Sequence, residues 1–166
     1  MDRIYCGAAK AVITPDASLW GRLEGLKRKH FGGVIDDIHF RVISFRCGGK
    51  RALFGAYELT RVCRPKETQS LISAHTGIPE ENIFLFATHT HAVPCTELPD
   101  KPGDPVPEEA AEATAEYVAM IQESVLASVD AAIAAEEPAG IGWSWGESAI
   151  NAVRNRSYTL TDENGE

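Results

Sequence analysis

The sequence predicts an α/β domain with a mixed sheet, in which a β-hairpin is followed by a right-handed parallel β-α-β crossover and helices pack on the sheet. The first observation is a Gly-Gly turn at 48–49 between two apolar strand patterns. The second is the order strand, helix, strand from 51 to 88, which describes a crossover. The third is a long helical stripe of apolar residues after position 108. We expect one domain over residues 1–166, a length that allows a sizeable core.

The first part of the chain predicts a strand, a long connection and the hairpin. Residues 5–13 have a strand pattern that ends at the turn signature Thr14-Pro15-Asp16. Glycines between 17 and 33 predict a long loop. The hairpin strands follow at 38–45 and 51–57. We expect His39, inside the first, to be an outward-facing or core residue, and Glu58, after the second, to be either a site carboxylate or an exposed strand-end residue.

The next elements are two helices and a strand-like segment. Pro65 suits a first helical turn and Gly77 a helix end, which predicts a helix with Leu71, Ile72 and His75 on its buried side. A second helix is expected from 108 to about 136. Its core-facing stripe is Val118, Ile121, Val125, Val129, Ala132 and Ile133. Residues 141–146 alternate like a strand and place both tryptophans on one face, as core or domain-interface residues.

Composition and charge narrow the functional classes. A net charge of -8 argues against nucleic acid as a partner, since proteins bind phosphate backbones through clustered Lys and Arg. We expect no transmembrane segment, and four scattered cysteines that remain free thiols. The N-terminal residues have no apolar leader, which favours the cytoplasm, or secretion if a targeting segment has been removed. A homo-oligomer is left open.

The segment from Asn82 to Pro94 is the strongest functional signal. Residues 83–87 are continuously apolar, as in a central strand covered on both faces. His89 and His91 follow, and strand alternation would place both on the same side at the carboxyl end of that strand. Open α/β sheets usually carry their sites there. Two imidazoles could hold a metal together, or one could hold it while the other acts on the substrate; half-buried histidines bonded to backbone are the alternative.

Several segments occur in a characteristic order along nearly the whole chain. They are Gly7-Ala8-Ala9-Lys10-Ala11-Val12-Ile13-Thr14-Pro15, then 36–41 and 53–59, then 77–83 leading into Thr88-His89-Thr90-His91, and last Asn155-Arg156-Ser157. In this order they resemble the N-terminal part of the catalytic domain of the neutral/alkaline (non-lysosomal) ceramidase family, whose motif at the histidines is Thr-His-Thr-His-Ser-Gly-Pro.

The resemblance implies a zinc-dependent hydrolase of the N-acyl bond of ceramide, with a lipid or other small amide as substrate. It implies that His89 is a zinc ligand and that His91 hydrogen-bonds the reacting carbonyl or the tetrahedral intermediate. Arg156, or failing that Arg154, would share the task of His91. Zinc in such a site lowers the pKa of its water to ~7.

The sequence also departs from the family pattern. Ala92-Val93 replaces Ser-Gly after the histidines, and Glu58 stands where the family commonly has Asp. The family's other zinc ligands, a histidine, a glutamate and a tyrosine, lie beyond Glu166. The resemblance therefore implies the N-terminal portion of a longer catalytic domain, with weak or absent zinc binding by these 166 residues.

Two other interpretations remain. The chain could be a non-catalytic binding or interaction module on the same scaffold. It could instead be another metallohydrolase with a strand-borne His-x-His that takes its remaining ligands from Glu58, Cys95 and Glu97.

Overall fold

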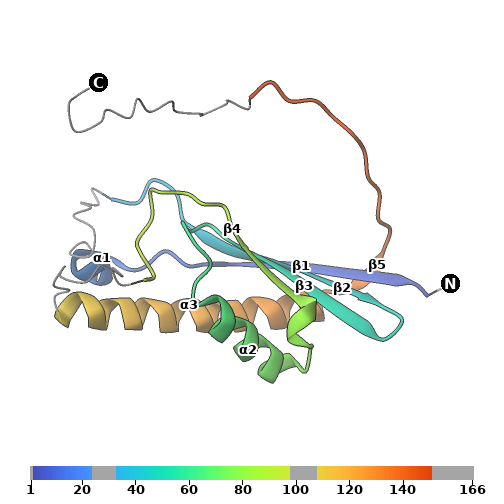
Figure 1. Cartoon of the computed structure of the whole chain (residues 1–166), viewed down its shortest axis with the longest axis horizontal. Helices are drawn as coiled ribbons and strands as arrows, with labels where there is room; N and C mark the ends of the chain where they lie inside the picture. The colour runs from blue at the N-terminus through green and yellow to red at the C-terminus, as the bar shows by residue number, and fades with distance from the viewer. Residues whose placement is uncertain (1, 24–32, 98–107, 151–166) are drawn as a thin grey trace, which may run out of the picture.

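The computed structural model describes residues 2–23, 33–97 and 108–150, which are built around a five-stranded mixed sheet (Figure 1). The strand order is β4-β3-β2-β1-β5. The pairs β1/β2, β2/β3 and β1/β5 are antiparallel, and β3/β4 is parallel. The strands are β1 (Ile4–Val12), β2 (His39–Cys47), β3 (Lys50–Tyr57), β4 (Ile83–Ala87) and β5 (Glu137–Ala139). This arrangement confirms the predicted mixed sheet with a hairpin and a parallel crossover.

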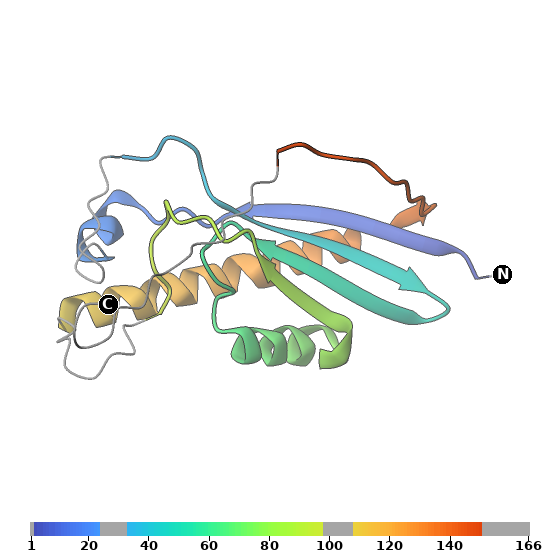
Figure 2. The same cartoon turned by 45° about the horizontal axis from the view of Figure 1, so that its top comes forward.

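The long helices lie on the same face of the sheet (Figure 2). The crossover helix α2 (Pro65–Thr76) joins β3 to β4 through the short 3-10 helix η2 (Glu80–Asn82). The helix α3 (Glu108–Ala134) runs beneath β1 and β2, and α1 (Ala17–Leu23) packs against it. The sheet is therefore covered on one face by α2 and α3, while the described residues leave the opposite face largely open.

Local chemistry explains the predicted hairpin and crossover. Gly48 and Gly49 both have positive φ, at 55° and 78°, which the tight β2–β3 turn requires and glycine tolerates. Pro65 lies in the first turn of α2, and Gly77 ends that helix in the left-handed region with its N–H donating to the Ser73 carbonyl. These glycines and Pro65 determine where the hairpin turns and where α2 begins and ends.

The core lies between the helices and the covered face of the sheet. The α3 stripe is buried as predicted, apart from the partly buried Ile133. At the end of α3 the backbone of β1 comes so close that a Cβ on Gly7 would lie 2.0 Å from the Ala132 carbonyl oxygen. Only glycine allows this approach without moving the helix.

A buried ion cluster fastens the chain after α3 to the hairpin. The Glu136 side chain is only 5% exposed and accepts hydrogen bonds from Arg46 at 2.6 Å, Arg51 at 2.7 Å and Ser44 at 2.7 Å. The hydrogen bond from Arg51 contributes most; with Ser44 and Arg46 it outweighs the opposing effect of burial and lowers the Glu136 pKa to about 2. This carboxylate is therefore charged at neutral pH and paired within the fold.

Two expectations about local structure were wrong. Residues 17–23 form helix α1 rather than part of a loop, because Asp16 caps it by accepting hydrogen bonds from the backbone of Ser18 at 2.8 Å and Leu19 at 3.1 Å. Residues 141–146 form no strand, and Trp143 and Trp145 are 82% and 89% exposed rather than in a core. The short strand of this region is β5 instead, which pairs with β1 before the chain leaves the sheet.

The prediction for the central apolar strand also needs correction. Among the described strands β4 lies at the edge of the sheet, and only Ile83 among its residues is fully buried. Phe84 and Phe86 project from the open face and are 42% and 50% exposed. A continuous apolar run thus arises here from an uncovered aromatic surface, not from cover on both faces.

Among the described residues, one helix, α3, has the length and composition of a helix that could cross a membrane. A core helix has the same composition. Because Tyr117, Ile121 and Val125 are fully buried against the sheet, core packing accounts for its apolar character.

His75 differs from its expected position. It lies exposed at the end of α2, where its Nε2 is 2.9 Å from the Asp130 carboxylate of α3. Ile72 is the buried residue of that turn. His75 therefore joins the outer sides of two helices rather than packing below one of them. All four cysteines are free thiols, as expected.

Candidate functional site

The two motif histidines lie where the parallel strands β3 and β4 end. The Thr88 N–H donates to the Tyr57 carbonyl at 2.9 Å and extends the pairing just past β4. The chain then leaves the sheet before it reaches His89. The rings of His89 and His91 are 4.7 Å apart between centroids and perpendicular to each other. The expected meeting of the histidines at the carboxyl end of the crossover is thus present, although the strand that precedes them is at the edge.

The expected reason for that meeting was wrong, because strand alternation does not align the histidines. His89 has φ of 62°, in the left-handed region that residues with a Cβ rarely adopt. Two contacts with Thr60, in the loop after β3, hold this conformation. The Thr60 hydroxyl donates to the Thr90 carbonyl at 2.8 Å, and His89 Nδ1 lies 2.7 Å from the Thr60 carbonyl. Strained backbone held in this way is common at functional sites.

The contact with Thr60 also fixes the chemistry of the His89 ring. A carbonyl oxygen can only accept, so Nδ1 must carry the proton that it donates. In a neutral ring this leaves the lone pair on Nε2, the atom that would coordinate a metal. Metal-binding histidines are usually oriented by such a hydrogen bond from the other ring nitrogen. His89 is exposed, so a metal could reach Nε2.

His91 faces a cleft of about 580 Å³. One wall comes from the segment after the histidines, including Val93 and Pro94. The other comes from Trp20 of α1 and from residues 33–38, among them Val34 and Ile35. Apart from His91 and a few polar groups, this lining is apolar. The cleft therefore places an imidazole beside a surface suited to an apolar group.

Glu58 is tied to β2. Its carboxylate accepts hydrogen bonds from the His39 backbone N–H at 2.7 Å and from Arg41, and lies 3.2 Å from His39 Nδ1. Burial raises the Glu58 pKa, but the hydrogen bonds from Arg41 and from the backbone and ring of His39 outweigh it and hold the pKa below its usual value. Glu58 is thus an ionised carboxylate that links the end of β3 to the start of β2 through its contacts with His39 and Arg41.

The ligand set drawn from Glu58, Cys95 and Glu97 is not assembled. Among the residues that the structure describes, no three His, Cys, Asp or Glu side chains lie close enough together to hold a metal ion. Glu97 instead pairs with Arg61 at 3.0 Å. His89 fits a metal ligand by its tautomer, but the described residues provide no complete ligand set.

Arg156 and Arg154 lie outside the described residues, so their predicted roles stay predictions. Sequence reasoning also missed two contributors to the site. Thr60 could have been found by extending the strand-end argument from β4 to its parallel neighbour β3. Trp20 was missed because α1 was predicted to be loop.

Comparison with known proteins adds information about the fold. No family model matches the sequence, and no curated protein matches it. Among solved structures, the chain is similar to neutral ceramidase from Pseudomonas aeruginosa, with a TM-score of 0.59 and 19% identity over 83% of this chain and 22% of that one. It is similar to a ceramidase solved as a complex with C2 over the same shares, with a TM-score of 0.59 and 18% identity.

These similarities concern architecture. The chain spans 22% of the length of the ceramidase structures that it matches. The structural neighbours of this β-hairpin, crossover and helix layer are thus neutral ceramidases, and the described fold corresponds to about a fifth of such an enzyme.

Proposed function

We propose that this chain is part of a ceramidase-like, zinc-dependent amide hydrolase, in which His89 binds zinc and His91 acts on the substrate carbonyl. The observation that carries the proposal is the hydrogen bond of His89 Nδ1 to the Thr60 carbonyl, which leaves Nε2 as the coordinating atom beside the perpendicular ring of His91. The fold shared with neutral ceramidases supports it.

The two histidines have separate tasks in this proposal. When bound, zinc would supply a Lewis acid and a water of lowered pKa. Thr60 holds the His89 ring in its coordinating tautomer. The His91 ring, whose centroid lies 4.7 Å from that of His89, donates a hydrogen bond to the substrate carbonyl oxygen as negative charge develops there. Arg156, with Arg154 as second choice, would donate to the same oxygen.

The cleft beside His91 supports an amide with an apolar substituent. Its walls at Trp20, Val34 and Val93 would accept an acyl or other hydrocarbon group while the carbonyl faces the imidazole. We propose a lipid amide of the ceramide class on this basis, together with the fold similarity.

Zinc titration tests the metal assignment in the chain itself. A catalytic zinc usually has three protein ligands, so we expect weak binding that His89→Ala abolishes and His91→Ala largely preserves. His75→Ala is the matched control, because His75 is also exposed but pairs with Asp130 on the helix layer. Zinc loss in His91→Ala but not in His89→Ala would reverse the two roles.

Activity tests the catalytic role in a chain extended by the remainder of a ceramidase catalytic domain. Hydrolysis of a fluorogenic N-acyl sphingosine should disappear in His89→Ala together with zinc. In His91→Ala, zinc should remain and turnover should fall about 100- to 1,000-fold, as expected for loss of one oxyanion donor. The 166 residues alone should not turn over the substrate; robust turnover by them would contradict the need for further ligands.

A binding module on the same scaffold is the second candidate, favoured by the absence of a three-ligand cluster among the described residues. In that case zinc would bind under no condition. A nitrogen–proton correlation spectrum of the His89 ring would then still show the Nδ1 proton, since that follows from Thr60 and not from a metal.

A further inference from the structure

We propose that residues 140–150 are a strap that closes over the open face of the sheet, with Trp143 and Trp145 seated on the aromatic rings of β3 and β4. This goes beyond the proposed hydrolase and does not depend on it. The segment leaves β5 at one edge of the sheet and passes over the face opposite α2 and α3 (Figure 1). It has no regular structure of its own.

The open face carries a row of phenylalanine rings that crosses three strands. Phe45 of β2 contacts Phe54 of β3 with ring centroids 5.6 Å apart, and Phe54 stacks on Phe84 of β4 at 4.9 Å. Phe54 and Phe84 are 38% and 42% exposed. A contiguous aromatic surface of this kind marks a contact site in a folded protein.

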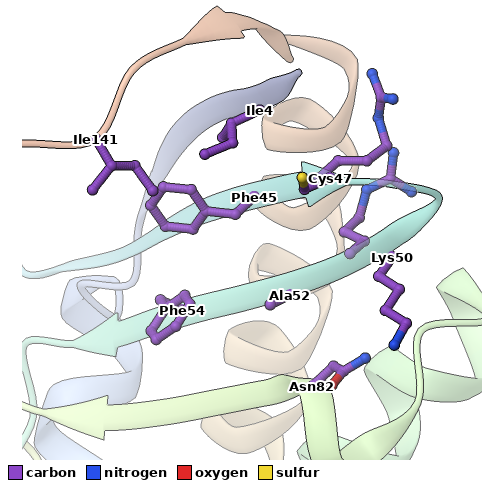
Figure 3. Close-up of a pocket in the computed structure, with 10 residues that line it drawn as sticks. Ile4, Phe45, Cys47, Lys50, Ala52, Phe54, Asn82 and Ile141 are labelled. Carbon is purple, nitrogen blue, oxygen red and sulfur yellow. The ribbon is translucent and has the colours of Figure 1, made fainter. Parts of the chain in front are cut away.

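The beginning of the strap borders the same hollow as this row. Ile141 lines, with Ile4, Phe45 and Phe54, an apolar hollow of about 540 Å³ (Figure 3). Figure 3 shows the Ile141 side chain directed at the ring of Phe45. Ile141 is still 68% exposed, so the strap borders the row without covering it, and the residues that would cover the rest of the row are those that follow Ile141.

The alternation and spacing of the strap side chains indicate which residues would cover the remaining phenylalanine rings. Ile141, Trp143 and Trp145 are two residues apart, so in an extended chain all three project to the same side. Alternate side chains of an extended chain are about 6.6 Å apart, close to the 5.6 Å and 4.9 Å steps of the phenylalanine row. With Ile141 at Phe45, the strap brings Trp143 over Phe54 and Trp145 over Phe84.

The strap sequence suits this path. Gly142 and Gly146 flank the tryptophans, and an added Cβ at Gly140, Gly142 or Gly146 would meet no atom within 4 Å. The two indoles are already in edge-to-face contact, 6.1 Å apart, while 82% and 89% exposed. Closing the strap buries these indoles and the phenylalanine rings together, so the hydrophobic effect drives it.

Tryptophan fluorescence tests the proposal in a Trp20→Phe chain, which keeps Trp143 and Trp145 as the reporters. We expect blue-shifted emission and weaker acrylamide quenching than for N-acetyltryptophanamide. Phe54→Ser should remove both effects. Val12→Ser is the matched control, since Val12 is a similarly exposed residue at the far end of β1, and it should leave them unchanged.

Each other outcome overturns the proposal. Indoles as accessible as the free compound would show that the strap stays open. Indole burial that appears only as the chain dimerises, followed by sedimentation, would assign the face to a second copy. If Phe54→Ser fails to fold, nuclear Overhauser contacts between the indole protons and the Phe54 ring in the parent chain decide, and their absence contradicts the strap.

Discussion

The two faces of the sheet differ in how far their side chains are buried and paired. On the face covered by α2 and α3, Leu53, Tyr57 and Phe40 are fully buried, and the charged groups at its edge are paired around Glu136. On the other face, Phe54 and Phe84 stack in the open. Both faces are apolar, but only one has a cover among the described residues.

The comparison shows that strand hydrophobicity alone does not reveal burial. Within β4, alternate residues of one apolar run face a packed helix layer and an uncovered surface. Large exposed apolar surfaces on folded proteins usually mark interfaces. The open face is therefore expected to contribute less to the stability of this chain than its composition suggests, and substitutions on each face test this difference.

The largest effect is expected on the covered face. Val125 of α3 is fully buried, so Val125→Asp would place an unpaired carboxylate against the sheet. We expect the free energy of unfolding to fall by about 3–5 kcal/mol, measured by urea denaturation. Ala127→Asp on the exposed side of the same helix is the control and should change it by about 0.5 kcal/mol or less. A Val125→Asp midpoint equal to that of the parent would mean that α3 is not docked through this stripe.

The second effect concerns the ion cluster at the edge of the covered face. The Glu136 pKa of about 2 in the folded chain lies below the ordinary value of 4.5. The carboxylate therefore contributes stability above pH 4.5 that is lost as the pH falls from about 4.5 toward 2. That difference corresponds to about 3 kcal/mol.

Glu136→Gln tests this contribution through chemical denaturation at several pH values. We expect a loss of about 3 kcal/mol at pH 7 that narrows as the parent is acidified through that window, because protonation removes the same charge. Glu137→Gln is the control, since Glu137 is the exposed neighbour in sequence. An equal loss in Glu136→Gln at pH 7 and at the acid end would show that packing, not charge, holds the cluster.

The sequence predicted those parts of the fold that local chemistry determines. The hairpin follows from Gly48-Gly49, the ends of α2 from Pro65 and Gly77, and the docking of α3 from its stripe. Helix α1 was not predicted, because the glycines nearby favour a loop. Asp16 before Ala17 could have been recognised as its capping residue. The covering of β4 could not be predicted, because it depends on elements distant in sequence.

The sequence predicted where the candidate site lies but not the local structure that brings its two histidines together. His89 and His91 do meet at the carboxyl ends of the parallel pair, as the crossover argument required. Their alignment depends on the left-handed backbone at His89 and on the contacts with Thr60, which no periodicity encodes. Glu58 was correctly placed at a strand end, but its contacts with His39 and Arg41 are set by the β2–β3 register.

The smallest effect is expected on the open face, at a ring beyond the proposed strap contacts. Phe86 is half exposed, so Phe86→Ser should lower the free energy of unfolding by about 1 kcal/mol, a fraction of the 1.5–3 kcal/mol for a fully buried side chain. Phe40→Ser is the matched change on the covered face, where Phe40 is fully buried against Tyr57, and should cost about 3–5 kcal/mol. Urea denaturation of both variants measures the ratio. If Phe86→Ser costs as much as Phe40→Ser, the rings of β4 are covered in solution, and the two faces are energetically alike.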